Sequence, residues 1–178
     1  MNRSWASRFT VKGGDAMAAI ALNGGATAPV VKDGHVTYTV ETYEEPWCAH
    51  RDPDTGECDD PRGDKWHTTG SGSTGALITG RGIAASSRFY VNGVSAAVVG
   101  DRVNEVWQAS PPVPSDTDRT RYINISPGKS GSGQGTIAGG NAKRVYLNGK
   151  LIAVQGSSVT TCLGTGTTIS EGNSLINM

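Results

Sequence analysis

The chain has 178 residues, enough for one domain with a sizeable hydrophobic core. Its 16 Lys and Arg residues balance its 16 Asp and Glu residues, so no basic surface that would bind nucleic acid or a membrane is expected. Glycine is abundant, at 25 residues, aromatic residues make up only 6%, and no long window shows the apolar spacing of a helix. Short apolar runs between Gly, Asn-Gly and Ser clusters predict an all-β domain with little or no helix.

No apolar stretch reaches the roughly 20 residues of a membrane span, so no integral membrane segment is expected. The first residues lead into no apolar signal-peptide core. The protein is therefore expected to be made in the bacterial cytoplasm, whatever its final location. Its three cysteines, an odd number, fit a disulfide framework poorly and leave metal ligation open.

The first forty residues predict hairpins. Residues 7–13 resemble residues 87–93, and residues 17–22 then match a second apolar run, so this segment is either a degenerate repeat copy or an ordinary hairpin. Residues 30–40 predict a second hairpin that turns at Asp33-Gly34, because apolar and polar residues alternate on its second arm. His35, beside that turn, is expected to be exposed.

An internal repeat dominates the second half of the chain. Residues 88–103 return as residues 144–159 without a gap, and each copy holds two apolar runs joined by Asn92-Gly93 or Asn148-Gly149. Asn-Gly between β-runs is the strongest short-range hairpin signal, because a type I′ turn needs positive φ at both central residues. A third copy starts at residue 168 and stops at Asn177, where the others turn. Its last strand is expected to close a sheet edge against an earlier copy.

Two segments interrupt this pattern and are predicted to be long loop insertions in a single domain spanning residues 1–178. Residues 41–75 are polar and acidic and carry two of the cysteines. Residues 108–134 begin with a proline-rich stretch, expected to be extended, and end with a Gly/Ser stretch, expected to be flexible. Between these stretches, residues 122–125 predict a short strand.

The order Ile-x-x-Gly, Asn-Gly-x-x-Ala-x-x-x-Gly-Asp, Cys and another Ile-x-x-Gly resembles the PAAR-repeat proteins. The matching stretches are residues 92–101 and 148–157, although the proline and arginine that give the family its name are absent from both. The resemblance covers about residues 76–178, with a weaker echo in the first forty. It makes the chain PAAR-like.

This resemblance implies a small cone of β-hairpins with pseudo-three-fold internal repeats. Such a cone caps a trimeric β-helical spike of a contractile injection machine, in a phage tail or a type VI secretion system, with one tip per trimer. It sharpens the spike for penetration of the target envelope and has no catalytic chemistry. The expected location is a virion tail tip or an extracellular injection particle, and the expected interface includes the turns Asn92-Gly93 and Asn148-Gly149 together with Asn177.

The resemblance also implies a metal near the apex, usually zinc or another transition metal such as iron. Cys48, His50, Cys58 and His67 could supply the two thiolates and two imidazoles of a tetrahedral site. Cys162 is an alternative ligand, because it follows the second strong repeat where family members place an apex cysteine; otherwise it is a small buried residue.

Three other interpretations of the 41–75 segment remain open. Cys48 and Cys58 could form a disulfide outside the cell, or these residues could simply be solvated. Asp52, Asp54 and Gly56 faintly resemble a calcium loop whose later ligands do not line up. The three tryptophans in or beside the insertions either pack at an apex or cover a thin core; they are Trp47, Trp66 and Trp107.

Two rival functions are weighed against the spike tip. An adaptor that links an effector or a receptor to the spike could dock on the two insertions, although the chain carries no extra domain for such cargo. A glycan hydrolase would need a carboxylate pair at a fixed separation, and nothing in the sequence fixes one. The acids available for such a pair are Glu44, Glu45, Asp52, Asp54, Glu57, Asp59 and Asp60.

Overall fold

The computed structural model describes residues 18–177 of the chain. This part consists of strands of very different length that are joined by turns and loops. This part contains no helix, which confirms the predicted all-β class. The strands are β1 (Ala19–Ile20), β2 (Val30–Glu44), β3 (Trp47–Arg51), β4 (Cys58–Arg62), β5 (Lys65–Ala84), β6 (Tyr90–Val91), β7 (Val94–Ser95), β8 (Arg102–Ser110), β9 (Thr120–Ser126), β10 (Ser130–Ile137), β11 (Tyr146–Leu147), β12 (Lys150–Leu151), β13 (Ser158–Thr160), β14 (Gly166–Thr168) and β15 (Asn173–Asn177).

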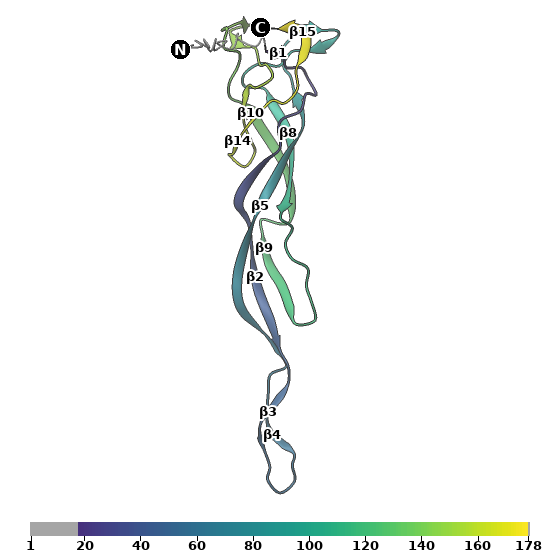
Figure 1. Cartoon of the computed structure of the whole chain (residues 1–178), viewed down its shortest axis with the longest axis vertical. Coiled ribbons are helices and arrows are strands. Elements are labelled where there is room, and N and C mark those ends of the chain that lie inside the picture. Colours follow the sequence, from purple (N-terminus) through teal and green to yellow (C-terminus); the bar gives the residue numbers. More distant parts are fainter. Residues whose placement is uncertain (1–17, 178) are drawn as a thin grey trace, which may run out of the picture.

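Seven of the strands form one antiparallel sheet, which we call the main sheet, in the order β14-β13-β10-β8-β5-β2-β9. Within it, β2 and β5 make a long hairpin that extends far beyond the other strands (Figure 1). The small hairpin β3–β4 stands at its far end, and the described ends of the chain lie together at the opposite end. The molecule is therefore a long shaft under a head, whereas a small cone was expected.

The sheet curls near the head until its edges meet. The N–H of Ala28, just before β2, donates to the carbonyl of Thr168 in β14 at 2.8 Å, and the N–H of Ser170 donates to the carbonyl of Ala26 at 3.0 Å. These bonds join the two sides of the sheet, so the upper shaft encloses a core rather than exposing one face.

The head consists of three two-stranded sheets, which we call the head hairpins. Two of them are hairpins in the usual sense, β6–β7 and β11–β12, and in the third the first strand, β1, pairs with the last, β15. Two of them turn at Asn92-Gly93 and Asn148-Gly149, with φ of 50° and 79° in the first turn and 51° and 79° in the second. Positive φ at both positions is the predicted type I′ geometry. The third hairpin is formed by the two ends of the described chain, because Ala19 pairs with Asn177. The last strand therefore closes against β1, in the N-terminal segment that the sequence left open as a degenerate copy or an ordinary hairpin.

The buried residues form three clusters along the long axis, and the layer next to the head is built from small and β-branched side chains. A second cluster surrounds Trp107 in the middle of the shaft, and a third lies beneath the head hairpins. Beyond them the core ends, since no residue from 37 to 73 is buried. Residues 37–73 are therefore held by backbone pairing between strands and by exposed side-chain pairs.

The structure differs from the sequence prediction in three segments. Residues 30–40 are not a hairpin: they belong to β2, and Asp33-Gly34 lies at a bulge in its pairing with β5. Residues 41–44 and 65–75 continue β2 and β5, and β3 pairs with β4 between them, so most of the first expected insertion is strand. The Gly/Ser stretch at residues 130–133 was expected to be flexible, but it lies in β10 and pairs residue by residue with β8.

The glycines of β10 explain this last difference, because the space above them is taken by neighbouring side chains. A Cβ on Gly131 would lie 2.7 Å from the Trp107 ring, and one on Gly133 would lie 2.6 Å from the Cβ of Cys162. The glycines are required by close packing rather than by flexibility. Residues 122–125, predicted as a short strand, lie within β9 and confirm that prediction.

Candidate functional site

Three tight turns beneath the head hairpins, residues 22–25, 98–101 and 154–157, are built alike. The third residue of each turn is a glycine with φ between 81° and 93°. Its N–H donates to the carbonyl of an isoleucine at 2.8–2.9 Å, and the N–H of that isoleucine donates to the carbonyl of the fourth turn residue at 3.0–3.1 Å. The glycine–isoleucine pairs are Gly24 with Ile83, Gly100 with Ile137 and Gly156 with Ile169.

Three alanines just before these turns close a cycle of hydrogen bonds. The N–H of Ala21 donates to Ala153 at 3.0 Å, that of Ala153 to Ala97 at 2.9 Å, and that of Ala97 back to Ala21 at 2.9 Å. All three residues are fully buried. Three segments far apart in the sequence therefore make the same backbone contacts around one point.

The side chains that cap the turns differ between them. Asp101 accepts the N–H of Val98 at 2.9 Å, and the hydroxyl of Ser157 accepts the N–H of Val154 at 2.9 Å. The first turn has Gly25 at this position, so no side chain there can accept the N–H of the first turn residue.

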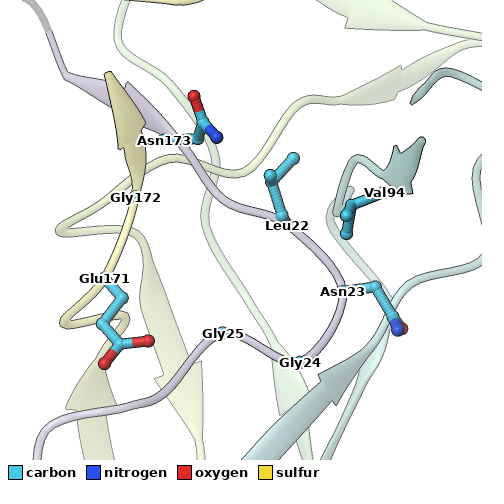
Figure 2. A pocket seen from close by; sticks show the side chains of 8 residues that line it. All are labelled: Leu22, Asn23, Gly24, Gly25, Val94, Glu171, Gly172 and Asn173. Carbon is cyan, nitrogen blue, oxygen red and sulfur yellow. The ribbon is translucent and has the colours of Figure 1, made fainter. Parts of the chain in front are cut away.

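A hollow of about 370 Å³ opens beside the first turn (Figure 2). Leu22 and the turn residues lie on one side of it, Glu171 to Asn173 on the other, and Val94 at its edge. The Glu171 carboxylate accepts the N–H of Ala26, the residue that follows the first turn, at 3.2 Å. The hollow therefore lies where the three turns differ.

Each head hairpin carries a large apolar side chain that is more than half exposed. Tyr90 in β6 is 60% exposed, Tyr146 in β11 is 56% exposed and Leu175 in β15 is 66% exposed. We call the end of the molecule that carries these three residues the head face. The predicted interface turns, Asn92-Gly93 and Asn148-Gly149, are exposed at the same hairpins, and Asn177 lies in β15.

The opposite end of the molecule holds the predicted metal ligands, but in separate arrangements. Cys48 and Cys58 are joined by a disulfide across β3 and β4. His50 instead bonds to the Asp59 carboxylate, at 2.7 Å, in the same hairpin. The disulfide was one of the alternatives that the sequence left open.

His67 lies closer to the shaft and forms part of a different network. Its Nε2 lies 2.7 Å from a Glu44 carboxylate oxygen, and the other oxygen of that carboxylate accepts the indole N–H of Trp47 at 3.0 Å. The Trp47 hydrogen bond, followed by the contact with His67, lowers the pKa of Glu44 below its usual value. The indole of Trp47 is therefore hydrogen-bonded, although the residue is 53% exposed.

The four predicted ligands therefore do not converge on one point. Within residues 18–177, no group of three or more His, Cys, Asp or Glu residues is placed to hold a metal ion. A disulfide also offers no thiolate. A metal site at Cys48, His50, Cys58 and His67 thus remains a prediction that applies to the reduced chain.

Cys162, the alternative ligand, lies between β13 and β14 on the inner face of the main sheet. Its backbone N–H donates to the Glu105 carboxylate at 2.6 Å. Partial burial, with the adjoining Glu105 carboxylate, raises the pKa of the Cys162 thiol to about 11. Its role as an alternative metal ligand stays a prediction.

The sequence did not place two polar residues, Glu105 and His35, on the inward-facing side where the structure has them. Glu105 is only 2% exposed, because the alternation of β8 places it on the same buried face as Val103 and Trp107. His35 was expected to be exposed, and this was wrong: its ring packs edge-on against Trp107 with centroids 4.7 Å apart. The alternation of residues 103–109 was the available signal for Glu105, whereas the bulge that turns His35 inward left none.

Comparison with protein-family models, curated proteins and solved structures finds no match for this chain. Residues 18–177 include no helix that could cross a membrane.

Proposed function

We propose that this protein is a structural tip that caps a trimeric β-helical spike of a contractile injection machine, with one copy on each trimer. The observation that carries the proposal is the cycle of hydrogen bonds between Ala21, Ala97 and Ala153. We infer that the segments around it are pseudo-three-fold repeats, because each also makes the same glycine–isoleucine pair. One chain with such repeats can match all three subunits of a symmetric partner.

The head face is the docking surface in this proposal. Apolar patches on a protein surface are typical of interaction sites. Most of the exposed large apolar residues of the described chain lie in or next to the head hairpins: Phe89, Tyr90, Val94, Val145, Tyr146 and Leu175. Within residues 18–177, β6 and β11 each pair with a single strand in their two-stranded sheets. The backbone groups on their other side can pair with the open strands at the blunt end of a β-helix.

The shaft then points away from the spike and meets the target first. The distal hairpin, defined as residues 47–62, stands at the end opposite the head face and presents Trp47 (Figure 1). Disulfides persist mainly in oxidising compartments, so the Cys48–Cys58 bond supports a working location outside the cytoplasm, on a virion tail or an injection particle. The envelope of the target cell is the surface that this end would contact.

Native mass spectrometry of the protein mixed with the cognate trimeric spike tests the proposal. We expect one copy on each trimer, and we expect the double substitution Tyr90→Ser and Tyr146→Ser to abolish the complex. Trp47→Ser is the matched control, because it removes an exposed aromatic side chain at the other end. Three copies on each trimer, no complex, or a loss of binding with the control alone would contradict the proposal.

A further inference from the structure

The distal hairpin lacks the contacts that normally hold a hairpin closed. β3 and β4 form a sheet of their own with two strands, and no residue in them is buried. An isolated hairpin of two strands is at best marginally stable in water. Regions with little buried apolar surface also open locally at low free-energy cost.

The polar contacts of the distal hairpin are all exposed and therefore weak. Arg62 bonds to Asp60 at 2.7 Å and His50 to Asp59 at 2.7 Å, with side chains between 41% and 65% exposed. Ion pairs of this kind contribute little, since water and salt screen them. The pairing ladder is itself interrupted, with irregular register on both sides of His50. Besides this ladder and the exposed hydrogen bonds of the turn at Asp52, the covalent bond between Cys48 and Cys58 is what holds the hairpin.

We propose that the Cys48–Cys58 disulfide makes the order of the distal hairpin depend on the redox state of its surroundings. In oxidising surroundings the hairpin is closed and extends the shaft. In thiol-rich surroundings two molecules of a thiol reductant each give one hydrogen atom to the disulfide. The S–S bond breaks, Cys48 and Cys58 each gain an S–H, and the two reductant molecules leave as their own disulfide. The released hairpin then opens while the head and the upper shaft stay folded.

The size of the effect follows from the length of the closed loop. The two cysteines are 10 residues apart, and closing a loop of that length favours the closed hairpin by a factor of about 100 in the chain-entropy description. The upper shaft and head do not share this dependence, because their cores are buried and Cys162 is free. Reduction should therefore act on one end of the molecule alone.

Hydrogen exchange with mass spectrometry tests this proposal on the whole chain. Full reduction, verified by three titratable thiols, should speed amide exchange in residues 47–62 by up to about 100-fold. Exchange at Ala21, Ala97 and Ala153 should stay unchanged. Limited trypsin digestion gives a second readout, because reduction should expose the bonds after Arg51 and Arg62 to cleavage.

Two variants separate the disulfide from other effects of the reductant. The double variant Cys48→Ser, Cys58→Ser should behave like reduced wild type and should not respond to reductant. Cys162→Ser should respond like wild type. The proposal is overturned if exchange in the distal hairpin is the same before and after full reduction, if it is already unprotected when oxidised, or if the head loosens equally.

Discussion

Replacing Asp101 with alanine should cost the head more stability than any other single loss of a turn cap. Its carboxylate is 4% exposed and accepts the N–H of Val98, the N–H of Ser86 and the Ser86 hydroxyl. The Val98 N–H is buried, so after Asp101→Ala it has no replacement partner, whereas exposed Ser86 can bond to water. An orphaned buried donor costs about 1–3 kcal/mol and a hydrogen bond to a charged group contributes about 1.5–3 kcal/mol.

Together these terms predict a loss of about 3 kcal/mol in the free energy of unfolding, or about 6–12 °C in Tm for a chain of this size. Urea unfolding followed by tryptophan fluorescence measures the loss, since Trp107 is buried. Ser157→Ala is the matched variant: it orphans the buried Val154 N–H but removes a single neutral bond, so about 1.5 kcal/mol is expected. A loss below about 0.5 kcal/mol in Asp101→Ala, or a larger loss in Ser157→Ala, would refute the reasoning.

Three further results are expected. Gly133→Ala should lower Tm, because its Cβ would lie 2.6 Å from the Cβ of Cys162, whereas Gly70→Ala, with open space around it, should not; equal effects would contradict the packing argument. The folded-state pKa of Cys162 lies above that of the unfolded chain, so its contribution to stability is complete below pH 9 and is lost as pH rises toward about 11. Replacing Cys162 with alanine should flatten this part of the unfolding curve, and an unchanged slope would count against it. Zinc should bind the reduced chain and be lost in the Cys48→Ser variant, as elemental analysis would show, and a metal-free reduced wild type would remove the predicted site.

The repeated part of the fold could be predicted because its signal is local. Asn-Gly between two apolar runs specifies a turn through backbone conformation alone, and the glycine at the third turn position does the same. Even the incomplete copy at the end of the chain was informative, because Asn177 marks the point where the earlier copies turn. The chain supplies the missing strand of that hairpin from its own N-terminal side, at β1.

The shaft could not be predicted in the same way, because partners far apart in the sequence decide its structure. Gly131 and Gly133 look like a flexible linker until the side chains of Trp107 and Cys162 are placed above them. Asp33-Gly34 looks like a turn because that dipeptide favours one, yet pairing with β5 absorbs it as a bulge. The candidate metal ligands show the same limit: their spacing permits one site, whereas pairing of β3 with β4 brings together the two sulfurs and separates His50 from His67.

The absence of buried residues between positions 37 and 73 has a consequence for how this protein can evolve. Beyond the residues of β2 that pair with β9, the ladder of β2 and β5 packs against no core, so its length there can change without repacking the core. Adding two residues to β2 and two to the facing part of β5 would keep every side chain on its original face and lengthen the shaft by about 7 Å. The length of the shaft is thus adjustable in this architecture. It depends on the number of paired residues in β2 and β5, while the head and its contacts remain the same.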